Sequence, residues 1–547
     1  MARVYQTPGV YIEERSAFPS SAVPVATAVP AFIGYTERAE RSKQSLLLKP
    51  TKISSFGEYL QFFGGAPTTK VELGDSPNPT IPYTVEIRES YFTLYAQMKM
   101  FFSNGGSDCY IVSVGGYTDD GGAVKLETLQ KGIDPLLKEM EPTMVVIPEA
   151  TTVKVDAGQE TAMVTAMNSL YAAVLKHCGT DMRSRFAITD VWMNRAAYQD
   201  PDYNMQDDID RYRGTIGSNN LQWGAAYFPY LNTLAVSADA VSLRNITNIG
   251  AVGDVREFPD GTFTEKGEIE KRDDFKTNFI DVPVTSLLSL LDRALNQDVY
   301  NGLAKPDFAK KVKEELFKEL PSMVADEEKL KTANQGLVAV SPMFKSVLRD
   351  IRRELNLLPP SAAMAGIYSM VDNTVGVHQS PANVSVGSVI DPAVTISSDQ
   401  QEDLNIPING KAVNAIRSFP GKGTLVWGAR TLDGNSMDWR YISVRRTVIF
   451  VEQSIKYAAE PYVFEPNTSS TWVNLKAVVV NFLTNVWQSG ALAGSTAADA
   501  FQVNIGLGVT MTPVDILDGY LRMSVKLAVT RPAEFIVITF EQKMQQS

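Results

Sequence analysis

The sequence predicts a multidomain α/β (α+β) protein, and three observations support this fold class. In the first half of the chain, short apolar runs that favour strands alternate with segments of helical spacing, which is typical of a domain with parallel strands. Near the end, residues 521–530 alternate between apolar and polar, which indicates a half-buried antiparallel strand. The length of 547 residues allows about two to four domains.

The alternation of helices and strands runs from residue 91 to residue 188. Apolar residues recur at helical spacing between Tyr91 and Phe102, and Asn104 begins an Asn-Gly-Gly sequence that is suited to ending a helix. The further elements predicted here are a strand at Cys109–Val114, a strand at Met144–Ile147, a helix at Met163–Leu175 and a strand at Phe186–Ile188.

The middle of the chain, from about residue 254 to residue 357, differs in composition from the part before it. Asp254–Asp274 is polar with charges of both signs, and it is predicted to be an exposed loop. Val284–Leu357 reads as mostly helical. Within it, Lys310–Lys331 is rich in Lys and Glu, which is typical of a solvated helix face.

A helix is predicted from Trp472 to Gln488, with hydroxyls at Ser469–Thr471 to cap its start and Gly490 to end it. Its apolar side and its polar side separate at helical spacing. The polar side consists of Asn474, Ala477, Asn481, Asn485 and Gln488, with Lys476 as the only charge. Solvent-facing helices normally carry more charge, so we expect this face to be covered in an assembly.

Two segments near the ends of the chain are predicted to be extended. Tyr5–Glu14 is strand-like, with Val10 and Ile12 on one face and Tyr11 on the other, and the stretch that follows it does not favour helix. Phe535–Phe540 is nearly continuous apolar sequence, and it includes Phe535, Ile536, Val537 and Ile538. Strands without a local partner must find a sheet elsewhere, in their own subunit or in a neighbour.

Composition argues against several classes of function. The net charge of −11 argues against a nucleic-acid surface, because phosphate binding needs clustered Lys and Arg. Two histidines and two cysteines without metal-ligand spacing indicate neither a metal site nor a disulfide framework, so we expect no cofactor and expect Cys109 and Cys178 to be buried. No long apolar run and no signal peptide are recognisable, so we expect synthesis and folding in the cytoplasm and no membrane insertion.

Few residues of the sequence point to a catalytic or nucleotide-binding site. Gly421-Lys422-Gly423-Thr424 lacks the first glycine of a phosphate-binding loop, which would fall at Ile416. The sharpest enzyme hypothesis is a polysaccharide-cleaving hydrolase that uses Glu149 and Asp190 as acid and base, because each follows a predicted strand. The simpler interpretation is that both carboxylates cap turns, and it requires no common cleft. His177 is expected to end a helix as an imidazolium.

Several stretches resemble the contractile tail sheath family of myophages, R-type bacteriocins and extracellular contractile injection systems. The resemblance extends in order over nearly the full length and is weakest at about residues 70–82 and 235–345. The segments that carry it are TPGVYIEE (7–14), ISSFGEYLQFFGG (53–65), FFSNGGSDCYIVSVG (101–115), LPPSAAMAGIYSMVDNTVGVHQSPAN (358–383), NAIRSFPGKGTLVWGARTL (414–432), VRRTVIFVEQSI (444–455), FEPN (464–467) and RPAEFIV (531–537).

The resemblance implies a structural, non-enzymatic subunit that forms stacked hexameric rings around an inner tube and contracts. Its implied partners are further copies of itself, the tube protein, and baseplate and terminal cap proteins. Strand exchange between subunits would use Val10, Tyr11 and Ile12 together with Phe535–Ile538, and the polar face of the Trp472 helix would meet the tube. A non-contractile tail or baseplate component remains an alternative, and phage, bacteriocin and injection system are not distinguished.

The same resemblance divides the chain into segments. An inner domain would combine the C-terminal third with the N-terminal arm, and an outer α/β domain would project from it. The expected segments are an N-terminal arm (1–30), an outer insertion region (31–100), a middle α/β domain with a variable helical segment (101–357), an inner C-terminal domain (358–530) and a C-terminal strand arm (531–547).

Overall fold

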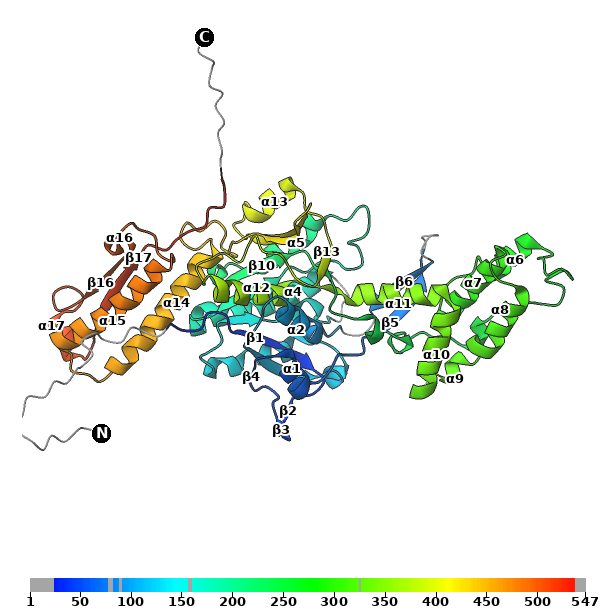
Figure 1. Ribbon diagram of the computed structural model, residues 1–547, viewed down its shortest axis with the longest axis horizontal. Helices are drawn as coiled ribbons and strands as arrows, with labels where there is room; N and C mark the ends of the chain where they lie inside the picture. The colour runs from blue at the N-terminus through cyan, green and yellow to red at the C-terminus, as the bar shows by residue number, and fades with distance from the viewer. Residues whose placement is uncertain (1–23, 77–81, 88–90, 156–159, 324–325, 537–547) are drawn as a thin grey trace, which may run out of the picture. The chain divides into compact units, whose positions relative to one another are not determined.

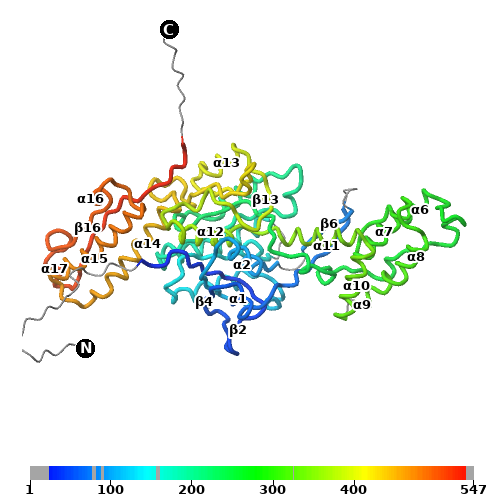
Figure 2. Tube along the Cα trace, viewed as in Figure 1, coloured from blue at the N-terminus to red at the C-terminus, as the bar shows by residue number. Residues whose placement is uncertain are grey.

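The chain forms a mixed α/β protein with two compact units (Figure 1), seen in a computed structural model that describes residues 24–76, 82–87, 91–155, 160–323 and 326–536. The large unit comprises residues 28–374 and 381–442, and the C-terminal unit comprises residues 443–536 with 24–27 and 375–380. Figure 2 shows the chain trace of both units. The predicted strand at Tyr5–Glu14 lies outside the described residues.

An eight-stranded sheet forms the centre of the large unit. Its order is β15-β14-β10-β9-β8-β1-β7-β4, and all neighbours pair in parallel except β4 and β15, the antiparallel edge strands. The strands are β1 (Pro30–Thr36), β4 (Thr51–Ile53), β7 (Cys109–Gly116), β8 (Met144–Val146), β9 (Phe186–Asp190), β10 (Gly224–Phe228), β14 (Val413–Phe419) and β15 (Gly423–Trp427). The predicted parallel α/β domain is thereby confirmed.

The central strands are apolar on both faces because helices cover both faces of the sheet. All seven residues of β1 are buried, and Phe32 pairs in register with Ile111 of β7 and Val146 of β8. The associated helices are α1 (Phe56–Phe63), α2 (Leu94–Ser103), α3 (Leu126–Lys131), α4 (Glu160–Lys176), α5 (Met205–Thr215), α12 (Ser361–Thr374) and α13 (Ser398–Asn405). The predicted helices at 91–102 and 163–175 correspond to α2 and α4.

A group of helices lies in sequence between β10 and β14 of the large unit and confirms that residues 284–357 are mostly helical. The large unit also contains shorter sheets: β2 (Glu40–Arg41) with β3 (Gln44–Ser45), β5 (Val71–Asp75) with β6 (Tyr83–Ile87), and β11 (Leu231–Thr233) between β12 (Leu357–Leu358) and β13 (Val389–Pro392). The helices are α6 (Arg272–Phe279), α7 (Leu287–Tyr300), α8 (Pro306–Val312), α9 (Leu320–Met323), α10 (Glu327–Val340) and α11 (Pro342–Leu355).

Two expectations about this helical group need correction. Lys310–Lys331 is not a uniformly solvated face, because Lys313 is 3% exposed and its ammonium lies 3.0 Å from Asp292. The loop at 254–274 is mostly exposed, as predicted, but Phe258 packs against Phe275 with ring centres 5.7 Å apart. An aromatic contact therefore holds one end of the loop. The mostly polar composition of the segment gave no indication of this contact.

The C-terminal unit combines two long helices with a two-stranded sheet. Its elements are α14 (Ile442–Ala459, whose first residue belongs to the large unit), α15 (Ser469–Gln488), α16 (Ala497–Ala500), β16 (Phe501–Ile505), α17 (Pro513–Leu517) and β17 (Met523–Leu527). The small core contains Val451 of α14, Val479 and Phe482 of α15, and Phe501 of β16. The predicted helix and the predicted half-buried strand are both present, but Thr468 rather than Ser469–Thr471 occupies the N-cap position of α15.

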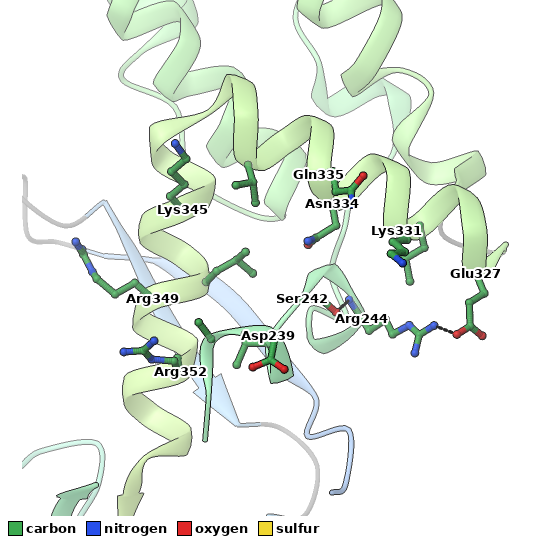
Figure 3. Close-up of a pocket in the computed structure, with 15 residues that line it drawn as sticks. Asp239, Ser242, Arg244, Glu327, Lys331, Asn334, Gln335, Lys345, Arg349 and Arg352 are labelled. Carbon is green, nitrogen blue, oxygen red and sulfur yellow. Dashed lines mark hydrogen bonds and ion pairs between the residues drawn. The ribbon is translucent and has the colours of Figure 1, made fainter. Parts of the chain in front are cut away.

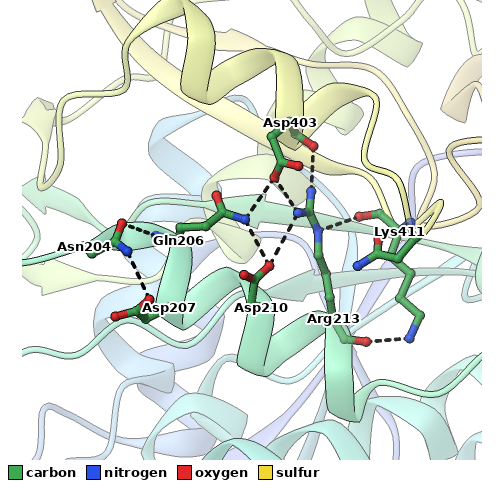
Figure 4. A network of polar contacts seen from close by, with 8 residues as sticks. Asn204, Gln206, Asp207, Asp210, Arg213, Asp403 and Lys411 are labelled. Carbon is green, nitrogen blue, oxygen red and sulfur yellow. Dashed lines mark hydrogen bonds and ion pairs between the residues drawn. The ribbon is translucent and has the colours of Figure 1, made fainter.

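The units divide the chain differently from the predicted segments. Residues 31–100 and 101–357 share the eight-stranded sheet, because β1 pairs with β7 and β8, and residues 358–442 supply its β14 and β15. Contacts of Arg213 in α5 help to keep residues 403–411 in the large unit (Figure 4). The Arg213 side chain is 2% exposed, forms an ion pair with the Asp403 carboxylate at 2.5 Å, and donates a hydrogen bond to the Lys411 carbonyl at 3.1 Å.

Candidate assembly surfaces

The sheet of the C-terminal unit has only two strands. β16 and β17 pair antiparallel, with Val503 opposite Val525, and the side chains of β17 alternate between half-buried and exposed. A two-stranded ribbon is marginally stable by itself, and each outer edge of such a ribbon presents backbone N–H and C=O groups that can pair with another strand. Within the described residues no third strand joins this sheet.

Large apolar side chains are exposed on the same unit. Monomeric proteins seldom expose large contiguous apolar patches, so such side chains are candidates for contact with a partner. They are Val375, Tyr457, Val463, Phe464, Val473, Leu507, Val509, Val514, Leu517, Tyr520, Phe535 and Ile536. Among them Leu517 is 86% exposed and Ile536 is 79% exposed.

The outward side of α15 carries the residues that were predicted to meet a tube. Asn474, Lys476, Asn485 and Gln488 are exposed, and Asn481 is partly buried. A helix turns about 100° per residue, so Lys476 lies about 140° around the axis from Asn481, near the border of the exposed arc. The amide side chains therefore form the centre of this polar face, and the lysine lies at its margin.

The predicted arm residues are only partly described. Val10, Tyr11, Ile12, Val537 and Ile538 lie outside the described residues. Phe535 and Ile536 are exposed and belong to no strand. Pairing of the arms with other copies therefore stays a prediction.

The described beginning of the chain lies against α14. The backbone N–H of Val25 donates to the Ser454 hydroxyl at 3.3 Å, and the Arg446 guanidinium donates to the Thr27 carbonyl at 2.9 Å. The sequence did not single out Ser454 or Arg446. The sequence gives little indication of this role. A Ser and an Arg in an apolar helix can be recognised as partners of the extended segment only when the position of that segment is known.

The two carboxylates of the enzyme hypothesis bind helix N-termini. Glu149 accepts hydrogen bonds from the backbone N–H of Tyr35 at 2.7 Å, Thr93 at 3.1 Å and Leu94 at 3.2 Å, the last two at the start of α2. Asp190 accepts one from the N–H of Ser361, the first residue of α12, at 2.8 Å. Anionic groups are favoured at helix N-termini, so both have a structural role.

Their burial gives both carboxyl groups unusual acidity. Burial raises the pKa of Glu149 to about 7, although its three N–H donors act in the opposite direction. Burial likewise raises the pKa of Asp190 to about 7. Both side chains are 0% exposed, so neither faces an open cleft in which a polysaccharide could bind, and the capping interpretation is favoured.

Other residues singled out by the sequence also have structural surroundings. His177 is 1% exposed and lies 2.6 Å from the Arg185 guanidinium, so burial and the neighbouring cation lower its pKa to about 4 and the expected imidazolium is wrong. Cys109 and Cys178 are buried free thiols, as predicted. Gly421, in the turn between β14 and β15, and Gly423, the first residue of β15, have positive φ angles, which glycine adopts more readily than other residues.

Two further features concern metal ligands and membrane-spanning helices. In the described part of the chain, no group of three or more His, Cys, Asp or Glu side chains is placed to hold a metal ion. Among the helices that the structure describes, none has the length and apolar character needed to cross a membrane.

Residues 435–543 match the family described as the phage tail sheath C-terminal domain. This range contains all of α14 and every later element of the C-terminal unit. Comparison with curated proteins found no match.

The whole chain also resembles solved sheath structures. The contracted helical sheath of the anti-feeding prophage (AFP) is 26% identical, with 99% of this chain and 100% of that chain covered and a TM-score of 0.53. A chain of the AFP baseplate structure is 25% identical with the same coverage and a TM-score of 0.52. The contracted sheath complex of PVC, an extracellular contractile injection system, is 24% identical over 99% of both chains with a TM-score of 0.54. The family-model match and these full-length likenesses support the resemblance of the chain to the contractile tail sheath family.

Proposed function

We propose that this protein is the sheath subunit of a contractile injection system, in which copies stack as hexameric rings around an inner tube and contract to drive the tube through a target envelope. The observation that carries the proposal is the likeness, over nearly the full length of both chains, to the contracted AFP helical sheath. Baseplate and terminal cap proteins would bind the two ends of the polymer. Assembly would begin in the cytoplasm of the producing cell.

The C-terminal unit supplies the contacts that such a polymer needs. The open edges of β16 and β17 would accept extended arms from neighbouring copies, with Val10–Ile12 and Phe535–Ile538 as the donated segments. Main-chain hydrogen bonds made in this way persist when the globular parts rotate, so the arms would serve as hinges. The exposed apolar side chains of this unit would be covered at the same time.

The tube contact is proposed to use the polar face of α15. Asn474, Asn481, Asn485 and Gln488 can donate and accept hydrogen bonds without a net charge. Weak polar contacts of this kind would let the sheath release the tube during contraction, whereas a desolvated ion pair or a large apolar contact would oppose release.

Electron microscopy of the purified full-length chain, with and without its co-expressed tube protein, tests the proposal. Long hollow cylinders are the expected result. A second candidate, a baseplate component, is favoured by the match to a chain of the AFP baseplate structure. Discrete rings that never extend would support that candidate and contradict the sheath proposal.

A further inference from the structure

A groove of about 670 Å³ lies in the helical part of the large unit, whose role the sequence left open. Figure 3 shows it between α10, α11 and the loop at residues 238–244. This volume is in the range of sites that hold ligands or peptide segments. Its apolar lining consists of Ala238, Val241, Leu330, Val338 and Leu348.

The rim of the groove carries an excess of positive charge. Five cationic side chains line it, against two acidic ones, Asp239 and Glu327. The cationic residues are Arg244, Lys331, Lys345, Arg349 and Arg352. Arg244 forms an ion pair with Glu327 and Arg349 forms one with Asp350, whereas Lys331 and Lys345 have no ion-pair partner among the described residues. A cationic rim on a chain of net charge −11 fits an acidic segment.

The chain itself contains such a segment, which we name the acidic hairpin (residues 259–270). The N–H of Thr264 donates to the Glu268 carbonyl at 2.8 Å, and the N–H of Glu270 donates to the Thr262 carbonyl at 3.1 Å. Its exposed acidic residues are Asp260, Glu265, Glu268 and Glu270, against one base, Lys266. Its apolar pair, Phe263 and Ile269, forms a bridge between the two arms of the hairpin.

The hairpin of one chain does not occupy the groove of the same chain. No residue from 259 to 270 lines the groove, and Phe263 is held near Phe275 of α6, with ring centres 6.1 Å apart. We propose that the groove binds the acidic hairpin of a second copy. This inference rests on the proposed function, which brings many copies close together, and opposite charges then favour the encounter.

A labelled cyclic peptide that reproduces residues 259–270 tests the inference directly on the full-length chain. Fluorescence anisotropy is measured with the unmodified protein, with the Lys331→Glu/Lys345→Glu variant, and with the control variant Lys305→Glu/Lys310→Glu. The control makes the same charge change on exposed residues of the same helical part that do not line the groove. We expect saturable binding that weakens with salt, and about tenfold weaker binding for the groove variant alone.

Three outcomes would overturn the inference. They are no binding to the unmodified chain, equal weakening by the control variant, and binding of inorganic polyphosphate to the groove where the peptide does not bind. The last outcome would assign the groove to a phosphate polyanion instead. Because the peptide assay needs no polymer, a failure to form cylinders would contradict the proposed function without deciding this inference.

A charge exchange within one chain gives an independent readout in the polymer. Glu265→Lys/Glu268→Lys should weaken polymer stability against salt, and combining it with Lys331→Glu/Lys345→Glu should restore it. Additive losses in the combined variant would contradict the pairing.

Discussion

Lys313 lies in a run of lysines and glutamates, yet its ammonium is enclosed by protein. It lies 3.0 Å from the Asp292 carboxylate, donates to the Arg256 carbonyl at 2.6 Å and sits 3.9 Å above the Phe258 ring. A buried charge is tolerated only with such compensation, because desolvation alone is costly. This one residue links α7, η9 (Lys313–Phe317) and the start of the 254–274 loop.

Replacing Lys313 by Met should therefore destabilise the large unit strongly. The change leaves Asp292 charged, buried and unpaired, which costs about 3 to 5 kcal/mol. Thermal unfolding of the full-length chain measures it, with Lys311→Met as the exposed control. The double variant Lys313→Met/Asp292→Leu should recover part of the loss, and equal effects of the two single lysine changes would refute the role of the buried pair.

Glu149 should make stability depend on pH near neutrality. Its pKa in the folded chain is raised by burial to about 7, above its ordinary value of 4.5, so the folded state holds the proton more tightly than the unfolded state. The stabilisation of the folded state by protonated Glu149 is fully present below pH 4.5 and is lost as pH rises to about 7. Between these values the slope is about −1.4 kcal/mol per pH unit.

Chemical denaturation of the chain between pH 5 and pH 8 would measure this slope, at about half-unit intervals. Glu149→Gln cannot ionise, so its slope should be shallower, while the exposed Glu127→Gln should leave the slope unchanged. Asp190 adds a contribution of the same sign, so a residual slope is expected in the Gln variant. Identical slopes in all three proteins would show that Glu149 does not titrate in this range.

At the scale of elements, the two-stranded sheet β16–β17 and the helix α15 carry the proposed assembly contacts. The sheet is short, half-buried and open at its edges, and α15 combines an apolar stripe facing β16 with an amide-rich outer face. Each of these elements packs against the rest of the C-terminal unit on one side only. The proposed function assigns their remaining surfaces to contacts with other copies and with the tube.

Removal of residues 1–15 should leave a folded, soluble protein that fails to build cylinders. The deletion takes away a proposed donated strand, whereas the contacts of Val25 and Thr27 with α14 remain. Circular dichroism checks folding, and electron microscopy checks assembly. Normal cylinders from the truncated chain would exclude a required role for the N-terminal arm.

Asn481→Glu should impair assembly around the tube. A carboxylate placed in this uncharged face and desolvated without a partner costs about 1 to 3 kcal/mol per subunit. Asn219→Glu adds the same charge to an exposed loop of the large unit and should have no effect. Co-assembly with the tube protein, scored by microscopy, is the measurement, and unchanged assembly of the Asn481 variant would argue against the tube contact.

At the scale of the whole molecule, motion of the proposed sheath would come from contact free energy alone. A polymer of identical subunits can store energy in one packing and release it in another, without any reaction in the subunit. Each exposed ion pair contributes only about 0 to 1 kcal/mol, but the increment is repeated in every subunit. Charged helices such as α8 and α10 are suited to such repeated contacts.

Contraction should therefore proceed without nucleotide or metal. Purified particles treated with mild denaturant in the presence of a chelator should shorten, and microscopy of particle lengths measures the response. Raising salt should shift the stability of the contracted form by screening surface pairs. A strict requirement for ATP would contradict a mechanism driven by contacts alone.

The sequence by itself determined the local elements of this protein. Buried parallel strands, the spacing of α2, α4 and α15, and the alternation in β17 all follow from short-range patterns of apolar residues, which survive in any tertiary setting. The family resemblance rests on the same linear information, and the match over residues 435–543 agrees with it.

Only the tertiary structure decided where distant segments meet. It placed β1, β7 and β14 in one sheet, paired Lys313 with Asp292, and assigned Glu149 and Asp190 to helix N-termini. Such partners lie tens to hundreds of residues apart, and the free energy of each pairing depends on burial that no local pattern encodes. The groove beside α11 was invisible in the sequence for the same reason: its cationic rim and apolar lining are assembled from three separate stretches of the chain.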